Sequence, residues 1–153
     1  MTHAKIVPMM AACAVLAAFS SVASAKTCTV ELQGNDQLKY DKDSIAVAAD
    51  CTEVEIKLKH SGNLPKASMG HNWVLTATPD FTPVTNAGLT AGPEQNYVPK
   101  GDKRVIASTK LIGGGESTSV KFPTSKLKKG GDYIFFCSFP GHWAVMKGKF
   151  TFG

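Results

Sequence analysis

Apolar and polar residues alternate with a period of two through much of the chain. The alternation is strict in 54–59, where Val54, Ile56 and Leu58 share one side, as expected for a strand with one buried face. The same register places His60 on that buried face. Similar patterns predict seven further strands, at 27–32, 44–48, 73–76, 104–107, 119–122, 132–137 and 147–152.

Turn-forming residues separate these strands at 61–63, 113–115 and 129–132. About eight short strands with such turns predict an all-β domain, a Greek-key sandwich of two antiparallel sheets. The chain shows no internal repeat and no sign of a second domain.

Only the segment 80–92 departs from this pattern, because it is too long for a turn and poor in strand-forming residues. Asp80 is a suitable N-cap, Pro83 suits a first helical turn, and Gly88 and Gly92 limit the length. We therefore expect one short helix there.

Residues 1–25 have the pattern of a secretory signal peptide. They combine a basic start, an apolar run of 14 residues at 6–19, and small residues at 23–25 that suit cleavage. The run is shorter than the about 20 residues of a membrane span, which disfavours a retained anchor helix. Lipid attachment at Cys13 is disfavoured because a good cleavage site follows it. We expect export and a mature single domain at 26–153.

The formal net charge of the whole chain is +5, and removal of residues 1–25 would take away one lysine. This mild excess favours solubility and some preference for acidic partners. The lysines near the end of the chain occupy loop and strand positions without interleaved aromatic residues: Lys126, Lys128, Lys129, Lys147 and Lys149. Such a pattern is typical of a solvated surface rather than of a nucleic-acid-binding patch.

Three cysteines, Cys28, Cys51 and Cys137, remain once residues 1–25 are removed. An odd number in an exported protein leaves one unpaired. Cys28 and Cys51 lie near strand ends, and a bridge between them would stabilise the fold by roughly 3–4 kcal/mol. Cys137 lies among other potential metal ligands, which would protect it from oxidation. We therefore assign the disulfide to Cys28 and Cys51 and a thiolate to Cys137.

The stretch 137–146 holds three potential metal ligands, Cys137, His142 and Met146, directly after an apolar run. One loop cannot easily close a metal shell, but an upstream Gly-His-Asn sequence supplies a second imidazole, His71. Two His, one Cys and a more distant Met are the ligands of a blue-copper electron-transfer site. Soft sulfur favours Cu(I), imidazole tolerates both oxidation states, and the axial Met tunes the potential.

Each of these residues alone has an ordinary explanation. His71 beside apolar Trp73 could be a hydrogen-bonded core histidine, Met146 a core filler, and Cys137 a small buried apolar residue. The spacing Cys-x4-His-x3-Met, together with the upstream histidine, makes a metal site the better interpretation. Asn72, next to His71, is a candidate hydrogen-bond donor to the Cys137 sulfur.

Three segments resemble those of azurins, the bacterial periplasmic blue copper proteins: 62–66, 69–75 and 135–142. The segments 104–107 and 109–113 fit as well, so the resemblance covers essentially the whole mature chain. Plastocyanins have a shorter Cys-to-His gap and a longer His-to-Met gap, whereas the gaps of four and three residues here match azurins. The resemblance implies a cupredoxin-like Greek-key β-sandwich of about eight strands with one short helical flap.

By this resemblance, His71, Cys137 and His142 are the equatorial ligands of one copper ion, and Met146 is the long axial ligand. Gly70 would place its backbone carbonyl opposite that methionine as a weak fifth contact.

The resemblance also implies hydrogen bonds to the Cys137 sulfur from Asn72 and from the backbone N–H of Phe139, as well as the bridge between Cys28 and Cys51. His60 matches a buried family histidine that some members link to pH effects. Our interpretation makes His60 a core histidine first and a pH switch second.

Members of the family usually dock their partners through an exposed apolar surface around the His142 edge. Leu64, Met69, Phe139 and Pro140 match positions of this surface, and we expect the patch in this chain to include His142 and Trp143 as well. Trp143 is a departure, since many azurins have a smaller residue there, and we hypothesise that it changes the partner preference. Unchanged electron-transfer rates in a Trp143→Ser variant would count against this hypothesis.

The leading interpretation is a type 1 (blue) copper protein that carries one electron between periplasmic redox partners, such as c-type cytochromes, nitrite reductase or amine dehydrogenases. The alternative is periplasmic copper storage, delivery or tolerance. A copper nitrite reductase also uses such a site, but its catalytic copper needs more histidines than His60, His71 and His142 provide, so no enzyme activity is expected. Zinc could bind the same ligands and would be redox-silent. We expect a monomer without a membrane anchor and without a nucleic-acid partner.

Overall fold

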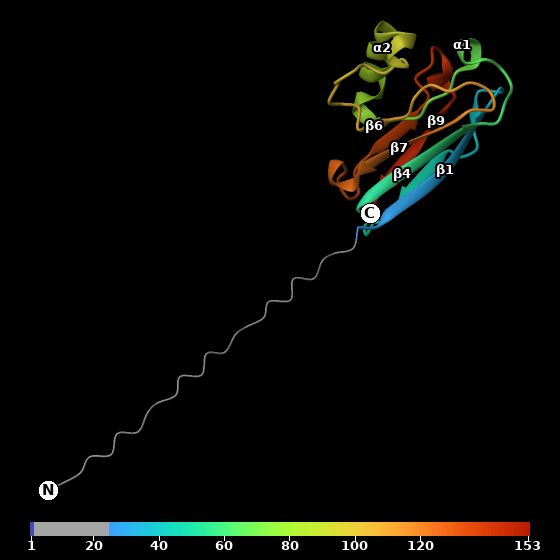
Figure 1. Ribbon diagram of the computed structural model, residues 1–153. Helices are drawn as coiled ribbons and strands as arrows, with labels where there is room; N and C mark the ends of the chain where they lie inside the picture. Colours follow the sequence, from blue (N-terminus) through green and yellow to red (C-terminus); the bar gives the residue numbers. More distant parts are fainter. Residues whose placement is uncertain (2–24) are drawn as a thin grey trace.

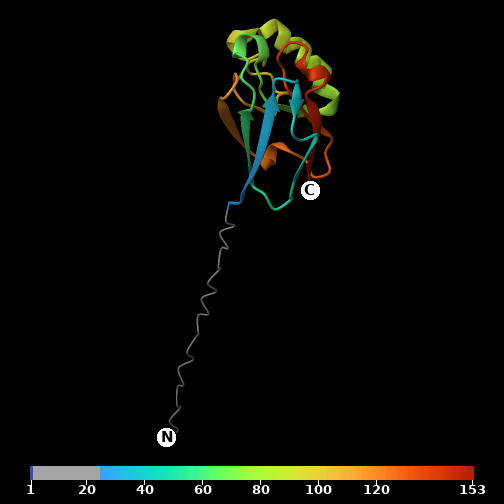
Figure 2. The same ribbon diagram turned by 90° about the vertical axis from the view of Figure 1, so that its right-hand side faces the viewer.

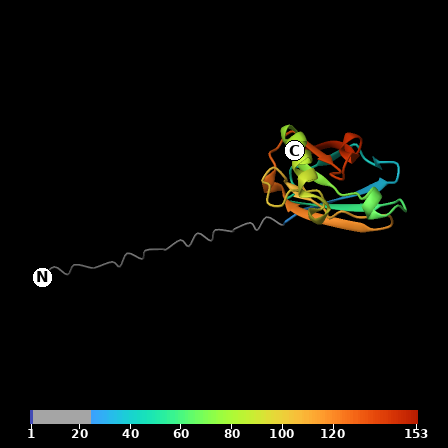
Figure 3. The same cartoon turned by 90° about the horizontal axis from the view of Figure 1, so that it is seen from above.

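The computed structural model describes Met1 and residues 25–153. Two β-sheets pack face to face, and the α-helices lie at one end of the sandwich, opposite the C-terminus (Figures 1 and 2). Figure 3 shows the sheets as two layers. The predicted signal peptide falls on residues 2–24, which lie outside the described residues. None of the helices in the described part of the chain has the length and apolar character needed to cross a membrane.

The first sheet has the strand order β2-β1-β4-β7, with bounds Thr27–Asn35 (β1), Lys39–Tyr40 (β2), Glu53–His60 (β4) and Ser117–Pro123 (β7). The second sheet has the order β3-β9-β8-β5-β6, with bounds Ser44–Val47 (β3), Val74–Ala77 (β5), Ala107–Ser108 (β6), Tyr133–Phe136 (β8) and Lys147–Phe152 (β9). The α-helices are Lys66–Met69 (α1) and Phe81–Ala91 (α2). Short 3₁₀ turns occupy Thr78–Asp80 (η1), Pro93–Gln95 (η2), Thr124–Lys126 (η3) and His142–Ala144 (η4).

The predicted all-β sandwich with a short helical flap is confirmed, but the prediction of two purely antiparallel sheets is wrong. β1 pairs parallel to β4, and β3 pairs parallel to β9. Between β1 and β4 the chain crosses to the other sheet to form β3, so β4 can return in the same direction as β1. Alternation of apolar residues could not reveal this, because it marks the buried face of a strand whatever the direction of its neighbour.

The strand predicted at 104–107 is also wrong, since β6 contains only Ala107 and Ser108. Asp102 accepts hydrogen bonds from the backbone N–H and the guanidinium of Arg104, and its own carbonyl accepts the N–H of Val105 at 3.1 Å. These local bonds form a turn where the sequence pattern predicted a strand. Helix α2 agrees with the predicted 80–92 segment, although the side chain of Asp80 makes no capping hydrogen bond.

The inner faces of both sheets form one apolar core around Trp73, which is fully buried. The ring centroid of Trp73 lies 6.1 Å from that of Phe122, 6.3 Å from Phe135 and 6.2 Å from Phe150. His60 is also fully buried, as its register in β4 predicted.

A second, smaller apolar cluster lies on the outer side of the second sheet, where α2 covers it. Its buried members are Val74, Val84 and Phe136, with Trp143 among the partly buried residues packed against them. Phe136 therefore faces α2 while its neighbour Phe135 faces the main core. Cover on both faces explains why β8 reads as a continuous apolar run rather than as an alternating one.

The predicted disulfide between Cys28 and Cys51 is present, with the Cα atoms 5.8 Å apart. It joins the start of β1 to the residues that lead into β4. Cys137 is buried and is the free cysteine of the described residues.

We expect the double variant Cys28→Ala/Cys51→Ala to lower the free energy of unfolding by about 3 kcal/mol, because the bridge closes a loop in the unfolded chain. Urea denaturation of the metal-free protein measures the change. Reduction of the wild-type disulfide is the control, since it removes the cross-link without truncating either side chain. A loss well below about 1 kcal/mol in both experiments would contradict the loop-closure argument.

Candidate metal centre

The four residues predicted as ligands lie on two loops: His71 on the loop from β4 of the first sheet to β5 of the second, and the other three on the loop from β8 to β9 of the second sheet. Cys137 directly follows β8, His142 lies in η4, and Met146 directly precedes β9. The N–H of Cys137 donates to the carbonyl of Met146 at 2.9 Å, which closes this loop. His71 lies between α1 and β5 and exchanges two backbone hydrogen bonds with Ile112, of 2.9 and 2.8 Å.

The ligand atoms of His71, Cys137 and His142 converge. The Cys137 Sγ lies 4.0 Å from Nδ1 of His71 and 3.6 Å from Nδ1 of His142, and all three atoms lie within 4.8 Å of one another. A metal with bonds of about 2.3 Å to thiolate and about 2.0 Å to imidazole would hold such a pair about 3.5–3.7 Å apart, at tetrahedral to trigonal angles. The observed separations therefore fit a single metal ion held by all three residues.

The ring of His71 is oriented by two contacts. Its Nε2 lies 2.9 Å from the carbonyl oxygen of Asn35, so Nε2 carries the proton and Nδ1 faces Cys137 as a lone-pair donor. Its other neighbour is the ring of His60, stacked on it with the centroids 4.2 Å apart. Nδ1 of His60 accepts a hydrogen bond from the N–H of Gly62, and its Nε2 donates one to the carbonyl oxygen of Met69. His60 is thus a hydrogen-bonded core histidine, as expected.

Burial favours the neutral form of both candidate imidazole ligands. It lowers the pKa of His71, and it lowers the pKa of His142 to about 4, with smaller contributions from the two neighbouring histidines. Both rings are consequently uncharged near pH 7 and can offer a lone pair. His142 is 5 % exposed, so the site approaches the surface through this residue.

Cys137 is fully buried, and burial raises the pKa of its thiol to about 11. The backbone N–H groups of Asn72 and Phe139 and the nearby Tyr40 hydroxyl act in the opposite direction and lower this pKa. The thiol is therefore protonated near pH 7 in the metal-free protein, and binding as a thiolate releases that proton.

The side chain of Asn72 ties together the two segments that carry ligands. Its Oδ1 accepts the N–H of Ser138 at 2.8 Å, and its Nδ2 donates to the Ser138 Oγ at 2.8 Å. The side chain of Asn72 therefore binds the residue that follows Cys137, while its backbone N–H lowers the pKa of the thiol.

Met146 and Gly70 both lie against the cluster. Met146 is fully buried, and the carbonyl oxygen of Gly70 lies 3.8 Å from the Cys137 Sγ. The sequence did not point to Gly34, whose backbone covers the site from β1. A Cβ there would lie 2.8 Å from Cδ2 of His71 and 3.3 Å from Cε of Met146, so a side chain at this position would displace both.

The residues predicted for a partner surface differ in exposure. Leu64 is 42 % exposed and Pro140 is exposed, whereas Met69, Phe139 and Trp143 are half-buried and His142 is nearly covered. Val145, which the sequence did not single out, is 62 % exposed beside them.

Sequence reasoning missed five residues that support the site: Asn35, Tyr40, Asn96, Tyr97 and Ser138. Tyr40 is buried and donates its hydroxyl to the carbonyl of Asn72. Ser138 follows Cys137 directly but bonds Asn72, and the other four residues contact the ligand segments from distant parts of the chain. No spacing pattern in the sequence signals such contacts.

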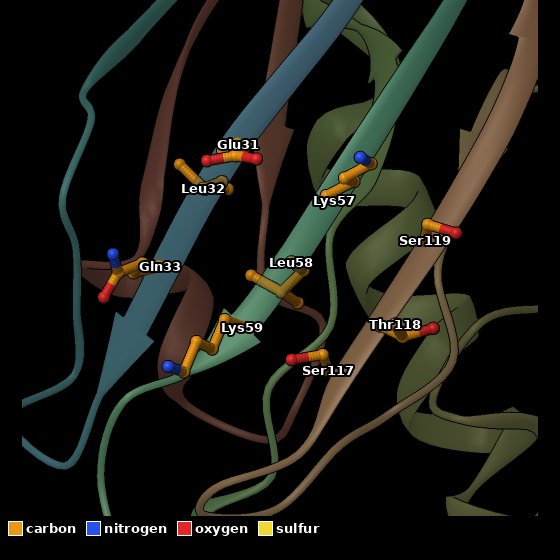
Figure 4. Close-up of a pocket in the computed structure, with 9 residues that line it drawn as sticks. All are labelled: Glu31, Leu32, Gln33, Lys57, Leu58, Lys59, Ser117, Thr118 and Ser119. Carbon is orange, nitrogen blue, oxygen red and sulfur yellow. The ribbon is translucent and has the colours of Figure 1, made fainter.

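A shallow cleft of about 470 Å³ lies elsewhere, over the outer face of the first sheet (Figure 4). It is lined by residues of β1, β4 and β7: Glu31, Leu32, Gln33, Lys57, Leu58, Lys59, Ser117, Thr118 and Ser119. Charged and hydroxyl side chains spread over this face, and none of the converging ligands borders it. The chemistry of the molecule therefore lies with the His71–Cys137–His142 cluster and not with this cleft.

Comparisons with known proteins agree with this geometry. A family model described as copper binding proteins, plastocyanin/azurin family, matches residues 26–153. The azurin of Bordetella pertussis is 51 % identical over 135 residues, which cover 88 % of this chain and 90 % of that protein. The azurin of Pseudomonas aeruginosa is 47 % identical over 142 residues, 93 % of this chain and 96 % of that protein.

A solved structure of the azurin Az-iso2 from Methylomonas sp. strain J superposes with a TM-score of 0.80 at 45 % identity, covering 82 % of this chain and 98 % of that one. The fold, the converging ligands and the identity over most of the length all lead to one assignment. This chain belongs to the plastocyanin/azurin family of copper-binding proteins, whose azurin members carry electrons with one bound copper and are not enzymes.

Proposed function

We propose that this chain is a periplasmic electron carrier in which His71, Cys137 and His142 bind copper equatorially and Met146 binds as a weak axial ligand. The carbonyl of Gly70 would be a fifth, weaker contact. Bound copper supplies a one-electron Cu(I)/Cu(II) couple at this position. The observation that supports this proposal is the convergence of one sulfur and two imidazole Nδ1 atoms within 4.8 Å of one another.

The role of the protein is to keep these ligands in place while an electron arrives or leaves. The Asn35 carbonyl fixes the ring of His71, and backbone N–H groups of Asn72 and Phe139 face the sulfur. Fixed ligands and a dry surrounding limit the rearrangement that would slow electron transfer. Such full burial also argues against copper storage or delivery, since those functions need sites that exchange metal readily.

For the partner surface we propose the exposed apolar rim around His142, formed by Leu64, Met69, Phe139, Pro140 and Trp143. Exposed Val145 extends it. The partners would be redox proteins such as c-type cytochromes, nitrite reductase or amine dehydrogenases. We further propose that the protein acts as a monomer.

We also propose that residues 1–25 are a signal peptide and that 26–153 is the mature domain. The match of the family model begins at residue 26, which supports this boundary. N-terminal sequencing of protein recovered from the periplasm tests the cleavage site and the location together.

The first test is the visible and EPR spectrum of the Cu(II)-loaded mature protein. We expect intense blue absorption and a narrow copper hyperfine splitting, both of which arise from thiolate bonding by Cys137. We expect the variant Cys137→Ser to lose this absorption completely while its metal-free form stays folded, with a loss of no more than about 2 kcal/mol in unfolding free energy. Circular dichroism and urea denaturation measure the fold.

Two outcomes of this experiment would count against the proposal. A pale wild-type protein with an ordinary tetragonal copper signal would mean that the four residues do not bind the metal together. A Cys137→Ser protein that is unfolded would mean that the thiol supports the fold itself. Zinc-loaded wild-type protein is the colourless control.

The second test concerns the axial position. We expect Met146→Leu to keep copper and blue colour while raising the reduction potential by on the order of 60 mV. The reason is that Cu(II) loses a weak donor, and a tenfold shift of the Cu(II)/Cu(I) equilibrium toward Cu(I) corresponds to about this change in a one-electron potential. Cyclic voltammetry measures the potential. Val145→Ala, which truncates the exposed neighbour, is the matched control and should leave the potential unchanged. Loss of copper binding in Met146→Leu would show that the thioether is essential to the ligand set.

A further inference from the structure

Two adjacent residues, Asn96 and Tyr97, have a left-handed backbone, each with φ of 56°. Leu38 is the third non-glycine residue of this kind in the described part of the chain. Asparagine tolerates the left-handed region, but a bulky aromatic residue there is an outlier. Strained backbone of this kind persists only where surrounding contacts hold it, and it concentrates at functional sites.

The turn that contains these residues, 92–97, is built against helix α2. The N–H of Tyr97 donates to the carbonyl of Gly92 at 2.9 Å, and the N–H of Asn96 donates to the carbonyl of Pro93 at 2.9 Å. A Cβ on Gly88, within α2, would lie only 2.3 Å from the carbonyl oxygen of Tyr97. The absence of a side chain at Gly88 therefore lets α2 lie directly on this turn.

Asn96 makes hydrogen bonds to both segments that carry equatorial ligands. Its carbonyl oxygen accepts Nδ2 of Asn72 at 2.8 Å and the hydroxyl of Ser138 at 3.3 Å. Its side-chain Oδ1 accepts the N–H of Leu111 at 2.9 Å. Since Asn72 follows His71 and Ser138 follows Cys137 in the chain, one residue fixes the neighbours of two ligands.

Tyr97 reaches the third ligand through aromatic contacts. Its ring meets Phe139 edge-on, with the centroids 5.4 Å apart and an interplanar angle of 73°. The ring of Phe139 in turn lies 4.5 Å from that of His142. The ring of Phe139 thus contacts both Tyr97 of the strained turn and the ligand His142.

We propose that Asn96 and Tyr97 are positioning residues for the metal centre, which hold Asn72, Ser138 and Phe139 and through them all three equatorial ligands. Backbone dihedrals decide where a carbonyl and a side chain point, so both residues need the left-handed conformation to direct the Asn96 carbonyl at Asn72 and the Tyr97 ring at Phe139. The proposal rests on the proposed function in that it takes His71, Cys137 and His142 as the ligands.

The test uses glycine variants, because glycine keeps a left-handed backbone without strain and so removes only the side chain. Zn(II) serves as a redox-silent probe, and Tyr97→Gly should weaken its binding by about tenfold. This is the lower end of the loss in metal affinity that is typical when a residue supporting a metal ligand is removed. Asn96→Gly should act in the same direction but less, since it retains the carbonyl acceptor. The exposed neighbour Glu94, changed to Ala, is the matched control and should bind Zn(II) like the wild type.

Amide hydrogen exchange in the metal-free protein separates positioning from general destabilisation. In Tyr97→Gly the amides of Ser138, Phe139 and His142 should exchange about tenfold faster relative to a core amide such as Leu75. Tyr97→Phe keeps the ring and should restore both the exchange and the Zn(II) affinity. Should Tyr97→Gly fail to fold, Tyr97→Leu replaces it, with the same change expected because the ring edge is lost.

The proposal is overturned if the variants bind Zn(II) as Glu94→Ala does, or if exchange at Leu75 rises as much as exchange at Ser138. Neither readout requires copper or electron transfer. A wild-type protein that binds Zn(II) but is not blue with copper would therefore overturn the proposed function alone. A blue wild type whose Tyr97→Gly form is unchanged would overturn only the role of the 92–97 turn.

Discussion

The burial of a thiol between two imidazoles is the constraint on which the rest of this structure depends. Burial raises the pKa of Cys137 to about 11 and lowers the pKa of His142 to about 4, so both shifts disfavour charge. A neutral cluster can remain dry inside a folded chain, whereas a buried unpaired thiolate or imidazolium would destabilise it strongly. Neutral forms of the thiol and the imidazoles are therefore compatible with the burial of the cluster.

Convergence of this kind requires support from both sheets. His71 lies just before β5 of the second sheet, but its Nε2 is held by Asn35 at the end of β1 in the first. Gly34 of the same strand lies close against its ring. The N–H of Cys137 donates a hydrogen bond to the carbonyl of Met146, and the N–H of the next residue, Ser138, donates to the side chain of Asn72. His71 and Cys137 are thus each held by groups from distant parts of the chain.

The sequence was sufficient for the features that have a local pattern. Alternation placed His60 and the inward residues of β4 correctly, the odd cysteine count left Cys137 unpaired, and the spacing of Cys137 and His142 pointed to the site. Parallel pairing of β1 with β4 left no such trace, because it depends on how the chain crosses between sheets. The hydrogen bonds of Asn72 to Ser138 and Asn96 join residues 66 and 24 positions apart, and no spacing rule reaches that far.

The loop 137–146, which carries three of the proposed ligands, lies where the main core meets the apolar cluster under α2. This position explains why the sandwich carries helix α2. Along β8, Phe135 enters the main core and Phe136 enters the cluster under α2, and the next residue is Cys137. Trp143, one residue after His142, packs against the same α2 cluster. The loop is thus held on its inner side by the sandwich and on its outer side by the helix. Without α2, Phe136 and Trp143 would face water, and the strand end that presents the thiol would lose one of its two covers.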